Sequence, residues 1–183
     1  MAIEVPNVGI RIAAVQSLVG GIRPMHGKGR RQVPAKIVSR QGSSVVAATE
    51  NDKSGADSYR DWIFRTSLDK VWAHYSEEWI PDNKQWSLKQ TALHIYTVES
   101  PNSRNEIFAF HCEPSHQGGT VSDRCKRGPH AHVTALTHEL NHAHIPMQLV
   151  GLDDSLESLE SLTSLFQTAI EVIEAEILPR ARG

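Results

Sequence analysis

Histidines are concentrated in one part of this chain. Seven of its ten histidines lie between positions 111 and 144, and both cysteines lie in the same window. Imidazole titrates near neutral pH and can transfer protons, and its neutral form binds metals such as zinc. The cluster therefore predicts a site for metal binding or for acid–base catalysis, with a set of solvated surface histidines as the third interpretation.

The spacing of the histidines is typical of strands. His130 and His132 are two residues apart, and residues at this spacing share one face of a strand. Thr134 continues the same face, while the apolar residues between them form the core side. His111 lies at the end of an earlier apolar strand, and His94 lies in the strand before that one. We expect a meander to bring three or four of these imidazoles together on one sheet face.

A metal site is the first chemical interpretation. Two histidines on one strand can bind one ion, and a neighbouring strand can supply the next ligand. The candidate ligands are His130, His132, His144 and Cys112, and the expected ion is zinc or another divalent metal. Familiar zinc spacings such as C-x-x-C and H-E-x-x-H are absent from the sequence.

Acid–base catalysis without a metal is the second interpretation. His111, His130 and His132 would transfer protons, while Thr134 and Arg127 would contact a phosphate group. The run His132-Val-Thr134-Ala resembles the H-φ-T-φ motif of two-histidine phosphoesterases, in which histidine moves protons and threonine holds phosphate. Those enzymes carry two copies of the motif, and this chain has one clean copy.

Charge is distributed unevenly along the chain. No acidic residue lies between Glu4 and Glu50, a stretch that holds seven basic residues. Lys28, Arg30 and Arg31 belong to a glycine-rich basic loop, which we expect to contact a nucleic-acid backbone. The C-terminal segment is acidic instead and predicts a protein partner, although the two ends of the chain could also attract each other.

The elements that position these residues follow from periodicity. Residues 1–50 are predicted to be rich in strands and loops, and 66–79 to form an amphipathic helix that begins near Thr66 and Asp69. A long helix is predicted over 153–178, with Asp154 and Glu157 as its capping box. Strands are predicted over 86–99, 106–112, 128–136 and 142–150.

These elements predict an α+β fold, an antiparallel β-meander packed by a long C-terminal helix. A basic β- and loop-rich region, 1–50, precedes a histidine-rich α+β domain, 51–183, and the two form one unit.

No run of apolar residues approaches the roughly 20 needed to span a bilayer. The N-terminus lacks the layout of a signal peptide, and two cysteines are too few for a disulfide scaffold. We therefore expect a cytoplasmic protein that does not contact membranes.

Three short segments carry a resemblance. His111 and Pro114 end a strand, Pro129 precedes the His130–His132 pair, and an H-I-P run holds His144 and Pro146. Over about 105–175 the chain resembles small, uncharacterised, histidine-rich bacterial proteins and is loosely similar to TumE-type toxins of toxin–antitoxin pairs. The resemblance implies a toxin or defence context.

Together these observations favour a hydrolase that cleaves phosphodiesters in nucleic acid, such as a toxin-like nuclease. It would use the clustered histidines, either alone or with a bound divalent metal. The alternative from a different class is a non-catalytic binding subunit of a larger assembly, with a structural metal or none.

Overall fold

The structure is a computed structural model that describes residues 3–22, 33–50, 62–66, 68, 70–100, 103–114, 120, 126, 128–134, 142–146 and 158–177. Within these ranges the side chains at 98–100, 103, 133–134, 142–146 and 177 are not described. The predicted contacts of Lys28, Arg30, Arg31 and Arg127 therefore lie outside the described residues, as does the predicted capping box at Asp154 and Glu157.

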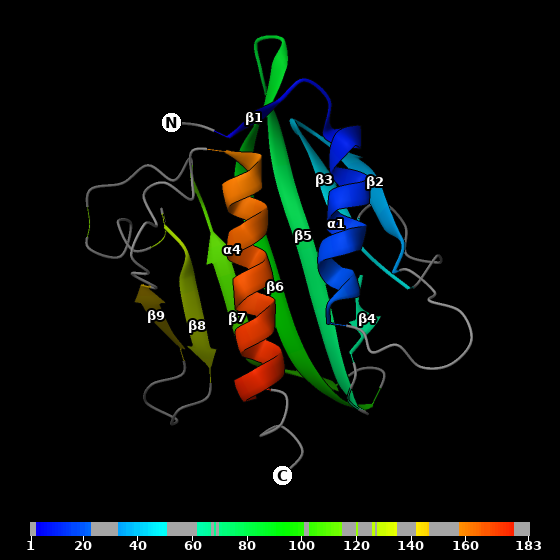
Figure 1. Ribbon diagram of the computed structural model, residues 1–183, viewed down its shortest axis with the longest axis vertical. Coiled ribbons are helices and arrows are strands. Elements are labelled where there is room, and N and C mark those ends of the chain that lie inside the picture. The colour runs from blue at the N-terminus through cyan, green and yellow to red at the C-terminus, as the bar shows by residue number, and fades with distance from the viewer. Residues whose placement is uncertain are drawn as a thin grey trace.

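One antiparallel sheet dominates the described part of the chain (Figure 1). Its central path runs β2-β3-β5-β6-β7-β8-β9, while β1 pairs with β6 and β4 pairs with β5. Strands from 1–50 thus pair directly with strands beyond 51, so one sheet runs through both predicted regions. The nine strands are β1 (Glu4–Val5), β2 (Ala35–Arg40), β3 (Ser43–Ala48), β4 (Phe64–Arg65), β5 (Val71–Asp82), β6 (Gln85–Ser100), β7 (Ser103–Cys112), β8 (His130–Thr134) and β9 (His142–Pro146).

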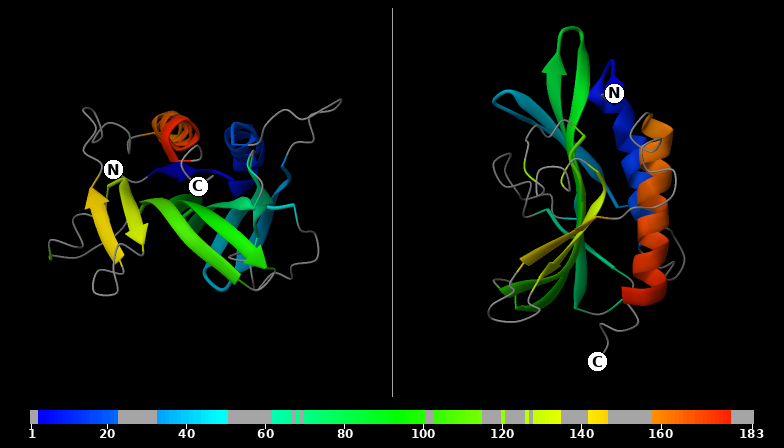
Figure 2. Two further views of the ribbon diagram at one scale, coloured as in Figure 1. Left: turned by 90° about the horizontal axis from the view of Figure 1, so that it is seen from below. Right: turned by 90° about the vertical axis from the view of Figure 1, so that its left-hand side faces the viewer.

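Two helices cover one face of the sheet (Figures 1 and 2). A 3₁₀ turn, η1 (Val8–Ile10), leads into α1 (Arg11–Gly20), and α4 (Leu159–Val172) continues as a π-helical turn, η3 (Ile173–Ile177). The core lies between these helices and the sheet. Phe166 of α4 makes edge-on contacts with Tyr75 and Phe110, at ring-centroid distances of 5.5 and 5.1 Å. The predicted α+β class and antiparallel meander are confirmed, and none of the described helices is long and apolar enough to cross a membrane.

The predicted helix at 66–79 is wrong, because this segment contains β5. Its apolar residues fit helical spacing, but Val71, Ala73 and Tyr75 also alternate along a strand and enter the core. Pairing with β3 on one side and β6 on the other supplies the backbone hydrogen bonds. Thr66, predicted to cap a helix, instead donates its hydroxyl to the Val71 carbonyl and accepts the Leu68 N–H, which closes the turn before β5.

Two further features differ from the sequence prediction, an additional helix and the first residue of the C-terminal helix. The region 1–50 contains the helix α1 as well as strands, because Val15, Leu18 and Val19 pack against the core from one side of it. The C-terminal helix begins at Leu159, since Ser158 has extended backbone and its hydroxyl accepts the N–H of Ser161. Ser158 therefore caps α4 and satisfies one of its exposed backbone donors.

The two faces of the sheet have different chemistry. Along β5, Tyr75 and Trp79 face the helices, while His74 and Ser76 line a pocket that is separate from that core. Strand pairing carries this alternation across the sheet, because directly opposed residues share a face. Histidines therefore collect on the face away from the helices, which we call the histidine face.

Candidate metal centre

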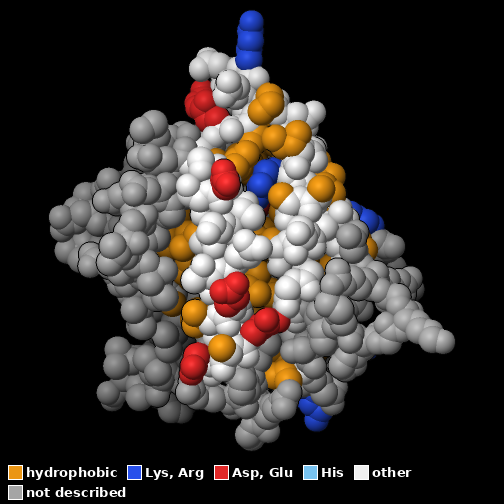
Figure 3. Space-filling model, in the orientation of Figure 1, with side chains coloured by type: hydrophobic (Ala, Val, Ile, Leu, Met, Phe, Trp, Pro, Cys, Tyr) orange, Lys and Arg blue, Asp and Glu red, His pale blue; other side chains and the backbone are white. Residues whose placement is uncertain are grey.

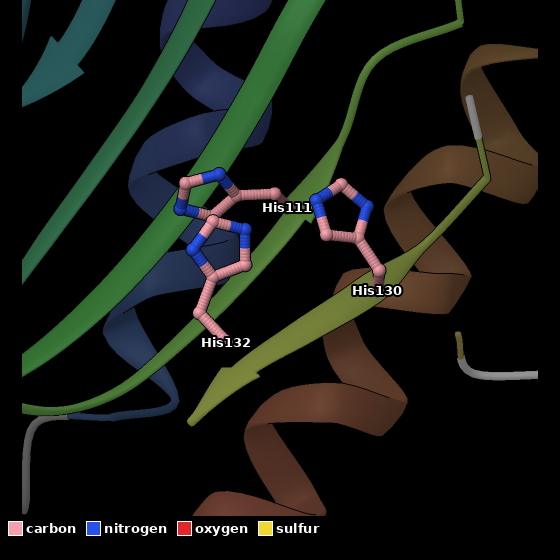
Figure 4. Close-up of side chains that lie close together, drawn as sticks. All are labelled: His111, His130 and His132. Carbon is pink, nitrogen blue, oxygen red and sulfur yellow. The ribbon is translucent and has the colours of Figure 1, made fainter. Parts of the chain in front are cut away.

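Three histidines from two neighbouring strands meet on the histidine face (Figure 4). Strand pairing sets His111 of β7 opposite His130 of β8, and sets Ala109 opposite His132. Each histidine offers one ring nitrogen, and these three nitrogens lie within 4.8 Å of one another. Among the described residues this is the group that could hold a metal ion, and we call it the histidine triad.

The histidine triad is buried. Exposed fractions are 8% for His111, 0% for His130 and 9% for His132, and the Nε2 atom of each is shielded from solvent. The His111 and His132 ring centroids are 4.0 Å apart, and those of His130 and His132 are 5.0 Å apart. Three imidazolium charges this close would repel one another, which favours the neutral form that binds metals. The interpretation of His130 and His132 as solvated surface residues is therefore wrong.

A backbone contact orients His130. Its Nδ1 lies 2.9 Å from the carbonyl oxygen of Gly128. A carbonyl oxygen only accepts hydrogen bonds, so Nδ1 carries the proton and Nε2 keeps the lone pair. Metal-binding histidines are commonly held in this way, with one nitrogen donating to a carbonyl and the other facing the ion. The donor set of the histidine triad therefore fits a metal of the zinc type.

The ring contacts continue across the sheet beyond the histidine triad. His94 of β6 meets His111 edge-on at 4.7 Å between ring centroids, and His74 of β5 lies 5.7 Å from His94. His94 also donates from Nδ1 to the carboxylate of Glu106 at 2.6 Å. The prediction that a meander would assemble three or four imidazoles on one face is confirmed.

A pocket of about 240 Å³ lies beside the histidine triad and shares His111 with it. Seven of its eight lining residues carry a polar side chain. The lining residues are His74, Ser76, Glu78, Gln90, Ala92, His94, Tyr96 and His111. A buried group of candidate metal ligands thus adjoins a space that could admit a small part of a substrate.

The structure places Cys112, a predicted metal ligand, away from the histidine triad. Cys112 follows His111 directly on β7, and consecutive strand residues point to opposite faces. Its side chain is fully buried in the core between sheet and helices. Burial, together with the nearby Glu113 carboxylate, raises the pKa of this thiol to about 12.

Cys112 is therefore expected to be unreactive in the native protein. In a Cys125→Ser variant, the remaining thiol should react with a chromogenic disulfide at pH 8 at least about 100-fold more slowly than in denaturant, because little thiolate forms. Stability contributed by the buried thiol is present below its ordinary pKa of 9.0 and is lost as pH rises toward about 12. Equal rates in native and unfolded protein would contradict this placement.

Two other predicted residues are placed only by their backbones. His144 of β9 is the pairing partner of His132, and Thr134 of β8 is paired with His142. Their side chains lie outside the described residues. The predicted roles of His144 as a ligand and of Thr134 as a phosphate contact therefore stay predictions.

Sequence reasoning missed His74 and Glu106 as neighbours of the site. His74 was not placed on the histidine face because the segment 66–79 was predicted to be a helix. The alternation of Ala73, His74 and Tyr75 is nevertheless a strand signal. Glu106 was also missed, because regular alternation along β7 predicts that its side chain lies on the opposite face from His111. A shift in pairing, with Ile95 opposite Phe108 but Tyr96 opposite Glu106, moves Glu106 to the histidine face.

One of the seven basic residues counted in the N-terminal segment has a structural role. Arg11 is 4% exposed and makes two hydrogen bonds to Glu77 of β5, at 3.0 and 2.7 Å. Burial alone would lower the pKa of Arg11, but the hydrogen bonds and charge of Glu77 raise it. Arg11 is therefore part of the core and is unavailable to nucleic acid.

Acidic side chains lie along the exposed side of α4 and of the η3 turn that continues it, as Figure 3 shows on the helix-covered face. Those of the described residues are Glu160, Glu171, Glu174 and Glu176. They lie on the opposite side of the sheet from the histidine triad. The predicted protein partner would thus bind away from the candidate site.

Comparison with family models, curated proteins and solved structures finds no match to this chain. The resemblance to histidine-rich bacterial proteins and TumE-type toxins therefore stays a prediction.

Proposed function

We propose that this protein is a metal-dependent hydrolase that cleaves phosphodiesters, with His111, His130 and His132 as the metal ligands. The observation that carries the proposal is the convergence of three buried imidazoles, with ligand nitrogens within 4.8 Å of one another, beside a polar pocket. The ion we propose is zinc or a similar divalent transition metal, because these ions prefer imidazole nitrogen.

The ligand set supports a catalytic centre. Catalytic zinc sites use three protein ligands and keep a further position for water or substrate. When bound, such an ion supplies a reactive water at neutral pH and polarises a phosphoryl oxygen. The protein's own part is to hold the three imidazoles on two rigid strands, with His130 oriented by the Gly128 carbonyl.

A row of directly paired residues across the histidine face includes a lysine, which favours an anionic substrate. In this row Lys36 pairs with Ala47, and Ala47 pairs with Ser76. Ser76 then pairs with Ala92, and Ala92 pairs with His111. Directly opposed residues share a face, so Lys36 lies on the histidine face. Four strand steps of about 4.8 Å separate it from His111, a distance of roughly 20 Å. A nucleic-acid strand that follows this row would meet a basic residue before it reaches the histidine triad.

A structural metal in a binding subunit is the second candidate. The shielded Nε2 atoms of the histidine triad favour it, because structural zinc sites are closed to water. The acidic side of α4 would then be the surface that meets a protein partner.

Elemental analysis and a cleavage assay on the same preparation separate the two candidates. We expect about one zinc or similar ion per chain. We also expect cleavage of bis(p-nitrophenyl) phosphate and of labelled single-stranded RNA, lost with a chelator and restored by metal. Bound metal without cleavage would favour the structural candidate. Folded protein with neither metal nor activity would overturn both metal-based functions.

A further inference from the structure

The pocket beside the histidine triad has an unusual hydrogen-bonding character. The Nδ1 atom of His74 lies 2.7 Å from the Trp62 carbonyl oxygen, which only accepts, so the proton is on Nδ1. Its Nε2 then accepts the hydroxyl proton of Ser76 at 3.0 Å. The Ser76 hydroxyl has one proton to donate, so toward the pocket its oxygen acts as an acceptor.

His94 is oriented differently. Its Nδ1 donates to the Glu106 carboxylate at 2.6 Å, which fixes the direction of the ring. His94 lines the pocket in this orientation.

A bulge in β7 makes the contact between His94 and Glu106 possible. His94 is opposite Ala109 and Ile95 opposite Phe108, but Tyr96 is opposite Glu106, so Ile107 is the extra residue. Regular alternation would send the Glu106 side chain to the helix-covered face. Bulges that re-aim a side chain in this way are over-represented beside functional sites.

Glu78 adds a carboxylate to the pocket wall. Its side chain is 13% exposed, and one oxygen binds the ammonium group of Lys89 at 3.1 Å. This ion pair compensates the charge of Glu78, so the pocket has acceptor atoms without needing a cationic occupant. Ser76 and Glu78 together present acceptors to a space of about 240 Å³.

We infer that this pocket binds the ribose of the substrate through its hydroxyl groups, so that the protein acts on RNA in preference to DNA. Hydroxyls donate to carboxylate and hydroxyl oxygens, and the 2′-hydroxyl is the group that distinguishes RNA from DNA. The space is about 240 Å³, and its lining residue His111 belongs to the histidine triad, where the phosphodiester would lie. The inference rests on the phosphodiesterase function proposed above and names its substrate class.

Binding tests the inference separately from cleavage. The protein as purified is titrated with fluorescent oligouridine and oligodeoxyuridine of equal length, both with phosphorothioate linkages that resist hydrolysis. One hydrogen bond to a charged acceptor contributes about 1.5–3 kcal/mol, so we expect RNA to bind about tenfold tighter or more. Glu78→Ala should reduce this RNA-to-DNA ratio toward one. Glu171→Ala, which removes the same charge from the exposed side of α4, should leave the ratio unchanged.

Ser76→Ala provides a second variant in case the first perturbs the pocket. It removes the hydroxyl oxygen that faces the pocket, and circular dichroism reports whether the sheet is kept. The RNA-to-DNA ratio should fall in this variant as well.

Each outcome bears on a different claim. Equal affinity of the wild type for RNA and DNA would overturn the ribose inference, while the cleavage assay judges the hydrolase proposal on its own. A ratio that persists in both Glu78→Ala and Ser76→Ala would overturn the assignment to this pocket. Absence of binding to either oligonucleotide, with no cleavage, would overturn both proposals.

Discussion

Alanine in place of any one of His111, His130 or His132 is expected to abolish stoichiometric metal binding. Each substitution removes one of three nitrogens that converge within 4.8 Å, and two ligands cannot hold the ion tightly. Loss of an outer partner of a metal ligand already costs about 10- to 100-fold in affinity, so loss of a ligand itself should cost more than about 100-fold. Metal content per chain, measured after gel filtration, reports the loss.

His74→Gln is the matched control for these variants. His74 lies on the same face and also contacts a histidine ring, but it is outside the histidine triad. We expect its metal content to equal that of the wild type. Circular dichroism should show that the alanine variants keep their sheet. Normal metal content in all three alanine variants would exclude the histidine triad as the site.

Arg11→Met is expected to lower the free energy of unfolding by about 3–5 kcal/mol, the range for breaking a buried ion pair by removing one partner. Methionine preserves most of the apolar volume, so the loss reports mainly on the charge of Glu77, which is fully buried. Tyr75 and Trp79 also donate to this carboxylate, at 2.8 and 3.3 Å, but neither carries a positive charge. Chemical denaturation measures the change.

Lys89→Met is the control, because Lys89 is half exposed in its pair with Glu78. Pairs of this kind contribute about 0–1 kcal/mol, so the expected change is small. If Arg11→Met also changed stability by less than about 1 kcal/mol, the buried pair would be dispensable to the fold.

The strands of the histidine face were predictable because their apolar residues fit the strand period and not the helical one. Residues 86–99 and 106–112 alternate or form short apolar runs between turn residues, and β6 and β7 occupy these segments. The H-x-H spacing of His130 and His132 then placed both imidazoles on one face, and the structure confirms it. The same alternation contains the signal that separates Cys112 from His111, since neighbours on a strand point apart.

The segment 66–79 was not predictable in the same way. Its apolar residues satisfy both a helical and a strand period, so the local sequence leaves the choice open. Pairing with β3 and β6 decided it, and those partners are distant in sequence. The position of Glu106 has a similar origin, because the bulge arises from the register between two strands.

By itself, then, the sequence of this protein determined which residues could share a strand face, because side-chain direction follows from backbone period alone. It thereby predicted an α+β fold and a histidine face with His111, His130, His132 and His144, and it wrongly added Cys112 to the metal ligands. Only the tertiary structure decided that the histidine triad is buried, that Arg11 pairs with Glu77, and that Glu106 orients His94. Those outcomes depend on the register of strands and on contacts between distant residues, such as the 66 positions between Arg11 and Glu77. No local pattern encodes them.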